Sequence, residues 1–204
     1  MRERTSTLYI AAHQSSSGTM LPPELTFREA TADDAGRISA LIASLARYFL
    51  ADPDRPQDAA AFFETITPAT IADSIVSGRY RYHVAESAGE LAGIVGVRDA
   101  GHLYHLMVAE PFHRRGIASR LWDVAKNAAA ADGNTGRFTV NSSVNAVRVY
   151  ERFGFTATGA VQVQNGIAFV PMELRGDLPS AGRAPDVRVA QDHLSSSQEK
   201  SWPS

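Results

Sequence analysis

The chain has 204 residues, a formal net charge of −2 at pH 7, 44% hydrophobic residues and no cysteine. This length suits one ordinary domain, and the lack of cysteine excludes disulfides and thiolate zinc sites. The near-neutral charge argues against broad electrostatic binding to nucleic acid or to an anionic membrane. The apolar stretch at 8–12 is too short for a signal peptide, and no longer run could span a membrane. We therefore expect a cytoplasmic protein whose partner is a small molecule.

The two ends of the chain differ in composition from its middle. Both ends are poor in large apolar residues and rich in Ser and Pro, which is typical of disorder. This contrast predicts disordered tails at 1–24 and 176–204 around one domain at 25–175. Patterned sequence begins directly after Met20, so Met1 and Met20 are both candidate starts of the natural chain.

The first predicted elements are a strand at 25–30, where apolar and polar side chains alternate, and a helix after it. Asp33 or Asp34 is placed to cap that helix, because short acidic side chains accept hydrogen bonds from free N–H groups. A second helical region covers about 58–77, in which Thr67 followed by proline is typical of a helix start. The apolar residues of the first helix recur at helical spacing, at Ile38, Leu41, Ile42 and Leu45.

Three strands come next. Residues 80–108 hold three runs rich in β-branched and aromatic residues, separated by turn signals at Ala88-Gly89 and Ala100-Gly101. Consecutive strands joined by such short turns form an antiparallel meander.

A longer helix follows the meander, and its apolar residues form one stripe. After it we expect a strand at 137–141, a short helix at 144–153 ended by Gly154, and a hairpin whose turn is Asn165-Gly166. The stripe of the longer helix consists of Ile117, Leu121, Val124, Ala125 and Ala128.

The predicted order of elements is β-α-α-β-β-β-α-β-α-β-β. Hairpins and βαβ crossovers occur together in this order, which indicates one mixed sheet with helices on its faces. The sequence therefore predicts a single α/β domain in which a mostly antiparallel sheet is flanked by about four helices.

Two segments carry a family resemblance: LMVAEPFHRRGIASRLWDVA at 106–125 and, after a strand, NAVRVYERFGF at 145–155. Together and in this order they resemble the signature segments of the GNAT superfamily of acyl-CoA-dependent N-acyltransferases, and the resemblance covers about residues 26–175. It implies an N-acetyltransferase that moves an acetyl group from acetyl-CoA to a primary amine by direct attack in a ternary complex. The alternative is a sensor or scaffold that keeps the CoA site without turnover.

The first segment contains the family's loop pattern, Q/R-x-x-G-x-G/A, although histidine stands at its first position. By resemblance, backbone N–H groups at the start of the following helix hold the diphosphate of CoA, an anion suited to the positive end of a helix. Taken alone, this stretch also fits a helix start with solvated arginines. No dinucleotide fingerprint or P-loop occurs in the chain. The loop residues are His113, Arg114, Arg115, Gly116, Ile117, Ala118 and Ser119.

The second segment supplies Asn145 and Tyr150. In the family, the Asn binds the pantetheine arm or nearby groups, and the Tyr gives its proton to the departing thiolate as a general acid. A tyrosine on an amphipathic helix is otherwise a core residue whose hydroxyl has a backbone partner. Asn141, at the end of its strand, is a weaker candidate for a contact with cofactor or acceptor.

The strand HLYHLMV should supply the rest of the chemistry. Resemblance implies that it separates from the next strand, that backbone groups near Met107 and Val108 bond the cofactor, and that an exposed N–H stabilises the thioester oxygen. His102 is the candidate base for the acceptor amine, although a histidine just after Gly101 also fits a turn. His105 should share the opposite face with the leucine between them, so we expect no metal site.

The acceptor site should be built from residues 45–80, and its amine cannot be named from sequence. Aromatic and acidic residues there could receive a cation, but the aromatics also fit the core and the acids a solvated loop. A small-molecule acceptor is preferred over a protein. The apolar strand at 166–174 further predicts a homodimer. The acceptor candidates are Tyr48, Phe49, Asp52, Asp54, Asp58, Phe62, Phe63 and Glu64.

Overall fold

The computed structural model describes residues 24–176. Residues 1–23 and 177–204, where the sequence predicts tails and two candidate starts, lie outside the described part. No helix within residues 24–176 is long and apolar enough to cross a membrane.

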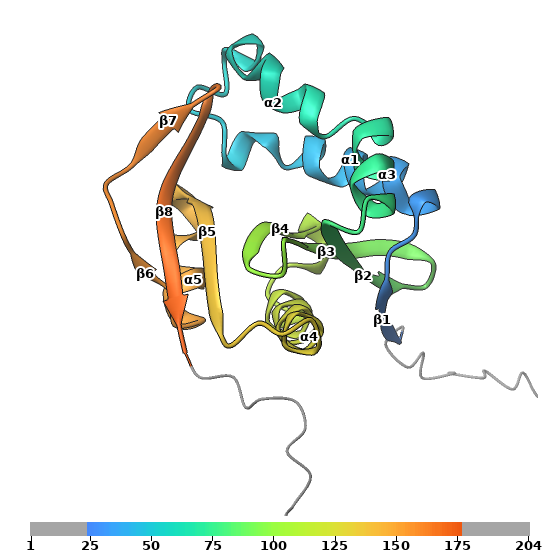
Figure 1. Ribbon diagram of the computed structural model, residues 1–204. Helices are drawn as coiled ribbons and strands as arrows, with labels where there is room; N and C mark the ends of the chain where they lie inside the picture. Colours follow the sequence, from blue (N-terminus) through green and yellow to red (C-terminus); the bar gives the residue numbers. More distant parts are fainter. Residues whose placement is uncertain (1–23, 177–204) are drawn as a thin grey trace, which may run out of the picture.

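Eight strands and five α-helices make up the described part of the chain (Figure 1). The strands are β1 (Leu25–Glu29), β2 (Tyr80–Ser87), β3 (Glu90–Arg98), β4 (His102–Val108), β5 (Arg137–Ser143), β6 (Thr156–Ala157), β7 (Gln162–Gln164) and β8 (Ile167–Arg175). The helices are α1 (Ala35–Ser44), α2 (Ala60–Thr65), α3 (Pro68–Val76), α4 (Ile117–Ala131) and α5 (Val147–Arg152).

The strands form one sheet in the order β1-β2-β3-β4-β5-β8-β6, with β7 also paired to β8. Every pairing is antiparallel except that of β4 with β5. In Figure 1, α1 and α3 cover one face of the β1–β4 half, α4 covers the opposite face, and β5 and β8 stand apart from that half. The predicted mixed α/β fold is confirmed.

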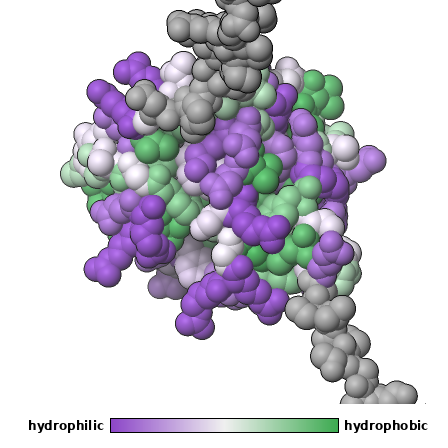
Figure 2. All heavy atoms as spheres, turned by 90° about the horizontal axis from the view of Figure 1, so that it is seen from below, coloured by the Kyte–Doolittle hydropathy of each residue, from purple (hydrophilic) through white to green (hydrophobic). Residues whose placement is uncertain are grey.

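Two hydrophobic cores lie on the two faces of the β1–β4 half. On the α4 side, Trp122 packs edge-on against Phe138 at a centroid distance of 4.9 Å. The buried stripe of α4 includes Trp122 and Ala129, where the sequence predicted Val124 and Ala128. The wide indole explains this shift, because burying it removes a large apolar area from water. The surface of the molecule seen from below in Figure 2 carries mostly hydrophilic side chains, with hydrophobic ones between them.

The region predicted as one helix at 58–77 is two helices, α2 and α3. Thr67 lies between them and caps α3, since its side-chain oxygen accepts from the backbone N–H of Thr70 at 3.2 Å. Pro68 at the first helical position has no N–H to continue α2. The helix start predicted at Thr67 is confirmed as the start of α3. The predicted order of elements counted this region as one helix, and that count is wrong.

The cap of α1 also differs from the prediction. Asp34 occupies the N-cap position, but its side chain accepts from the backbone N–H of Thr31 at 2.9 Å and does not cap α1. The buried carboxylate also receives hydrogen bonds from Arg28 and Arg37. These bonds, the one from Arg28 first, hold the pKa of Asp34 well below its usual range.

Two of the predicted turns are confirmed, and the third shifts by one residue. Ala88-Gly89 and Asn165-Gly166 both have positive φ, as a two-residue hairpin requires. The β3–β4 turn is centred on Asp99 and Ala100, one residue before the predicted pair.

The C-terminal strands contain one element that the sequence did not predict. Strand β6 has only two residues, and it pairs with β8 beside β7. Strand β8 therefore has neighbours on both sides, β5 on one and β6 with β7 on the other. The homodimer was predicted to form through this strand, but β8 has no free edge at which a second copy could pair. The oligomeric state stays a prediction.

Candidate active site

Strands β4 and β5 separate shortly after they meet. They pair only at His102↔Thr139 and Leu103↔Val140, so the rest of β4 has no partner on that side. A cleft of about 1040 Å³ lies at this separation, and its walls come from β4, the start of α4, β5, α5 and the β7–β8 hairpin. The sheet's own geometry thus leaves backbone groups of β4 facing a cavity.

One end of the cleft is the N-terminus of α4. Gly116 is its N-cap residue with a φ of 75°, and no side chain caps the helix. Within residues 24–176 no side chain accepts from the backbone N–H groups of the first turn, which carry the positive end of the helix dipole. A Cβ at Gly116 would meet nothing within 4 Å, so the space beside this backbone is open. Arg114, three positions before the start of α4, also has a positive φ, 59°, and lines the cleft.

The other side chains of this loop have protein contacts. The guanidinium of Arg115 lies over the ring of Phe112 at 5.2 Å, and Arg115 does not line the cleft. His113 lines the cleft, but its Nε2 donates to the carbonyl of Val108 at 2.7 Å. The ring therefore ties the loop to the end of β4 and leaves only Nδ1 for a ligand. Every other residue predicted for catalysis or cofactor binding also lines the cleft.

Tyr150 lies in the wall of the cleft on α5. Its ring packs edge-on against Phe155 at 5.6 Å, and the residue is only 6% exposed. No partner for its hydroxyl is found among residues 24–176, yet the oxygen is not enclosed by protein. A core tyrosine would have a backbone partner at this atom. Burial raises the pKa of Tyr150, so the phenol keeps its proton at neutral pH.

The two asparagines lie in the cleft wall in different ways. Asn145 donates from its side-chain amide to the carbonyl of Tyr48 at 3.0 Å. This bond joins the start of α5 to the segment after α1, across 97 positions of sequence. Asn145 thus holds two walls of the cleft together, whereas Asn141 is exposed in the cleft.

A β-bulge in β4 changes the direction of its side chains. Gly96 pairs with His105 but Val97 pairs with Leu103, so Tyr104 is an extra residue in β4. Leu103 is buried in the core on the α4 side, whereas His105 bonds Tyr82 in the core on the α1 side.

His102, Tyr104 and His105 consequently lie together. The His102 and Tyr104 ring centroids are 6.2 Å apart, and those of Tyr104 and His105 are 4.5 Å apart. The prediction that His105 shares a face with Leu103 is wrong, because a bulge reverses the alternation that a regular strand would have. The two-residue alternation of side chains along a strand does not reveal such a bulge from sequence.

The two histidines have different surroundings. His102 lines the cleft, and its Nδ1 lies 2.8 Å from the hydroxyl of Thr139. Burial, with a smaller contribution from Arg98, lowers its pKa. His105 is 5% exposed and its Nδ1 lies 2.8 Å from the Tyr82 hydroxyl. Burial lowers the pKa of His105 to about 3, so this ring is neutral at physiological pH.

The far end of the cleft contains residues that the sequence did not single out. Arg98 at the end of β3 and three residues of the β7–β8 hairpin line it, together with the expected Tyr48, Phe49 and Phe62. Phe63 and the four acidic candidates do not line it. No sequence signal linked Arg98 or the hairpin to the site, because the pairing of strands in the sheet is what brings both to the cleft. The hairpin residues are Gln164, Asn165 and Ile167.

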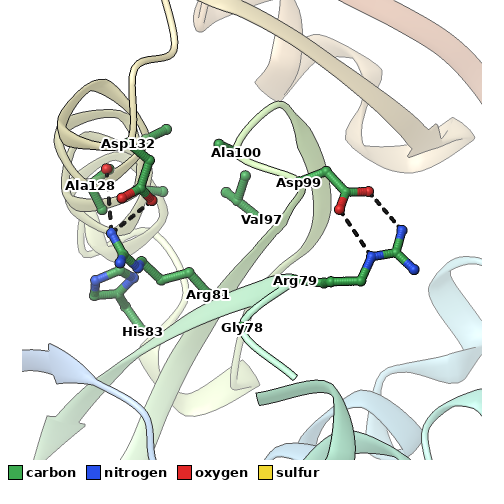
Figure 3. Close-up of a pocket in the computed structure, with 11 residues that line it drawn as sticks. Gly78, Arg79, Arg81, His83, Val97, Asp99, Ala100, Ala128 and Asp132 are labelled. Atoms are coloured by element: carbon green, nitrogen blue, oxygen red, sulfur yellow. Dashed lines mark hydrogen bonds and ion pairs between the residues drawn. The ribbon is translucent and has the colours of Figure 1, made fainter. Parts of the chain in front are cut away.

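A second hollow, of about 350 Å³, lies between β2, β3 and the C-terminal end of α4 (Figure 3). Its charges are paired with one another: Arg79 bonds Asp99 through two atoms at 3.1 and 3.0 Å, and Arg81 meets Asp132 at 2.8 Å. His83, which also lines this hollow, has a buried Nδ1 for which no described residue is a hydrogen-bond partner. No cluster of three or more metal-binding side chains is found within residues 24–176.

A split sheet, a cleft lined by an uncapped helix N-terminus and titratable side chains in the same cleft form an arrangement that suits one class of protein. It suits an enzyme that binds an anionic co-substrate together with a second substrate.

Comparison with known proteins defines the family. The family model for the acetyltransferase (GNAT) domain matches residues 50–175. A curated acetyltransferase of Agrobacterium fabrum is 37% identical over 71 residues, which are 34% of this chain and 52% of that protein. The match thus spans about half the length of that relative.

Solved structures share the fold. A GCN5-related N-acetyltransferase from Rhodopseudomonas palustris has a TM-score of 0.61 at 22% identity, over 76% of this chain and 98% of its own. The PaiA N-acetyltransferase of Thermoplasma acidophilum, solved with coenzyme A, has a TM-score of 0.59 at 12% identity, over 74% and 98%. Mutant forms of the spermidine/spermine N-acetyltransferase SpeG of Vibrio cholerae give 0.53 at 19%, over 74% and 93%. The chain belongs to the GNAT family of acetyltransferases, which are acyl-CoA-dependent N-acyltransferases.

Proposed function

We propose that this protein transfers the acetyl group of acetyl-CoA to a primary amine of a small molecule by direct attack in a ternary complex. The observation that carries the proposal is the cleft between β4 and β5, which joins the uncapped N-terminus of α4 to Tyr150 and His102. The coenzyme A complex of the PaiA relative agrees with such a co-substrate. The chain has no cysteine to carry a covalent acyl group, which favours direct attack.

The start of α4 is the part of the cleft that fits the diphosphate of CoA. The backbone N–H groups from Arg114 to Ser119 would donate to the phosphate oxygens, and Gly116 lets the backbone come close to them. The unpaired edge of β4 at Met107 and Val108 would bond the pantetheine amides as a neighbouring strand does. Acetyl-CoA supplies the reactive thioester carbonyl at the point where the strands meet.

His102 is the proposed general base. When its Nδ1–H donates to the Thr139 hydroxyl, Nε2 has a free lone pair. Because burial lowers the pKa of His102, the ring is neutral at pH 7 and able to accept a proton from the amine. Thr139 would then orient the base, as a hydrogen-bond partner does for many catalytic histidines.

Tyr150 is the proposed general acid. Its raised pKa keeps the phenol protonated, and its hydroxyl has no acceptor among the described residues. The proton is therefore available for the thiolate that leaves when the C–S bond breaks.

Thiol release from acetyl-CoA across a panel of primary amines tests the proposal. A thiol reagent should report release only when protein and a suitable amine are both present, and mass spectrometry should find the acetylated amine. Reactions without amine measure background hydrolysis. Saturable binding of CoA with no release for any amine would contradict the proposal and favour a sensor.

A further inference from the structure

The acceptor end of the cleft has apolar and aromatic walls. Phe49 and Phe62 lie in an edge-to-face contact at 5.2 Å, and both line the cleft. Ile167 and Phe169 of β8 and Tyr104 of β4 complete the walls. Such a surface gains free energy by covering an apolar or aromatic body.

The charges of this cleft have one sign. Arg98, Arg114 and Arg152 line it, whereas none of its lining residues within 24–176 is Asp or Glu. The nearby Glu110 is outside the lining, where it pairs with Arg47 and accepts from the Tyr48 hydroxyl at 2.8 Å. A second ammonium group of an acceptor would find no carboxylate here, and a buried charge without a partner is unfavourable.

Arg98 is placed beside the proposed base. Arg98 and His102 are direct partners in the β3–β4 ladder, so their side chains leave the same face of the sheet. The nearest carboxylate to Arg98 is Asp99, 3.7 Å from Nε, and Asp99 already accepts two hydrogen bonds from Arg79. The Arg98 guanidinium lies over the Tyr104 ring, 5.6 Å from its centroid, which occupies one of its flat faces. No hydrogen bond from Arg98 to another described residue is found, so the edge of its planar fork of N–H donors is open to a carboxylate.

We propose that the acceptor is an α-amino acid with an apolar or aromatic side chain, bound through its carboxylate to Arg98 with its amino group at His102. This inference rests on the acetyl transfer proposed above and names its second substrate. The adjacent ladder positions of Arg98 and His102 match a carboxylate and an amine joined to one carbon atom. The side chain lies among Phe49, Phe62 and the β8 wall. Polyamines and protein N-termini do not fit, since both lack that carboxylate.

In the reaction, the neutral α-amino nitrogen forms a bond to the thioester carbonyl carbon, and the C–S bond breaks. The amine proton passes to His102, and Tyr150 gives its proton to the sulfur. The products are an N-acetylamino acid and CoA.

Four acceptors test the inference: phenylalanine, phenylalaninamide and phenethylamine, which differ only in the group on the α-carbon, and spermidine, a polyamine without carboxylate or aromatic ring. We expect kcat/KM for phenylalanine to exceed those of the other three by at least about tenfold, because a site built for a charged group rejects analogues without it. Arg98→Gln should remove this preference by raising the KM of phenylalanine, while phenethylamine is affected less than about twofold. Arg175→Gln, at an exposed position on the far end of β8, is the matched control.

Equal or better acetylation of spermidine or phenethylamine would overturn the inference and leave the proposed acetyl transfer intact. So would an unchanged preference in Arg98→Gln. If no amine is acetylated, calorimetry of phenylalanine and spermidine with the CoA-saturated protein separates the two proposals. Binding of phenylalanine that is lost in Arg98→Gln would support the ligand class while the transfer fails, and the lack of such binding would overturn the ligand class.

Discussion

The two hollows of this molecule differ in how their polar groups are satisfied. In the hollow of Figure 3, Arg79, Arg81, Asp99 and Asp132 bond one another across β2, β3 and α4. In the cleft, no side chain caps the first turn of α4, and the Tyr150 hydroxyl has no hydrogen-bond partner among the described residues. The Arg98 guanidinium there has only a 3.7 Å approach to Asp99 and a contact with the face of the Tyr104 ring. Native proteins rarely leave polar groups without partners unless something else binds them. The difference therefore separates a site that awaits ligands from one that stabilises the fold.

His83 in the hollow of Figure 3 is an exception, but it does not change this distinction. The Nδ1 atom of His83 has no hydrogen-bond partner within residues 24–176, but this atom is enclosed by protein. Burial lowers the pKa of His83, so the ring stays neutral and avoids an unpaired charge.

Gly116→Asp should have the largest effect on the cleft. The substitution places a carboxylate where the phosphates would lie, so CoA affinity should fall by more than about 100-fold. Any side chain is strained at the positive φ of Gly116, so both this variant and its control should lose some thermal stability. Gly116→Asn is the matched control, since Asn also adopts positive φ but adds no charge. Isothermal calorimetry measures both variants. Equal affinities for wild type and Gly116→Asp would refute the assignment of this loop.

Tyr150→Phe should reduce kcat by about 100-fold, the scale of general acid catalysis, with little change in CoA affinity. The ring and its packing against Phe155 remain, so only the proton is lost. Acyl donors with better leaving thiols should show a smaller deficit. Tyr80→Phe, outside the cleft, serves as the control. A variant that keeps more than about half of kcat, with chemistry rate-limiting, would exclude this role.

His102→Gln should lower the rate about tenfold at pH 7, less than the roughly 100-fold or more typical of a general base, because water can also accept the proton. The base must be neutral to act, so activity rises as pH increases through the pKa of His102. Burial places that pKa below the ordinary value, so the rise should be complete by about pH 7. Plotting the ratio of wild-type to variant rates against pH cancels the titration of the acceptor amine. A ratio independent of pH would argue against His102 as the base.

Asp132→Ala in the paired hollow should have the smallest effect. Its ion pair with Arg81 is 39% exposed on both sides, and exposed pairs contribute about 1 kcal/mol or less to the free energy of unfolding. Asp132 also lies at the C-terminal end of α4, where a negative charge opposes the helix dipole, and its removal offsets part of the loss. Chemical denaturation should show this small change, and CoA affinity should stay within twofold of wild type. A large loss of CoA affinity would mean that the two hollows are coupled.

Local signals in the sequence predicted most of the fold. The hairpins at Ala88-Gly89 and Asn165-Gly166 and the helix start at Thr67 each depend on a few adjacent residues, whose preferences act at short range. The bare start of α4 was likewise visible as a glycine before an apolar stripe. Strand β6 was missed because two residues pair with β8 without any periodic pattern of their own.

The site residues that lie in continuous segments of sequence were predictable. Those brought to the site by the pairing of strands were not. The loop before α4 and Tyr150 lie in two continuous segments, and the cleft contains both. The bulge at Tyr104, which places His105 beside His102, arises from the register with β3. Arg98 enters the cleft only because β3 pairs with β4. Contacts of this kind depend on the register between strands, which a single sequence does not display.

A crystal structure of the protein with CoA would test the proposed binding site. We expect the diphosphate oxygens to lie within hydrogen-bonding distance of backbone N–H groups between Arg114 and Ser119. We also expect the pantetheine arm to lie between β4 and β5, with the sulfur near the Tyr150 hydroxyl. CoA bound in the hollow of Figure 3, or with its diphosphate away from the start of α4, would contradict the proposed site.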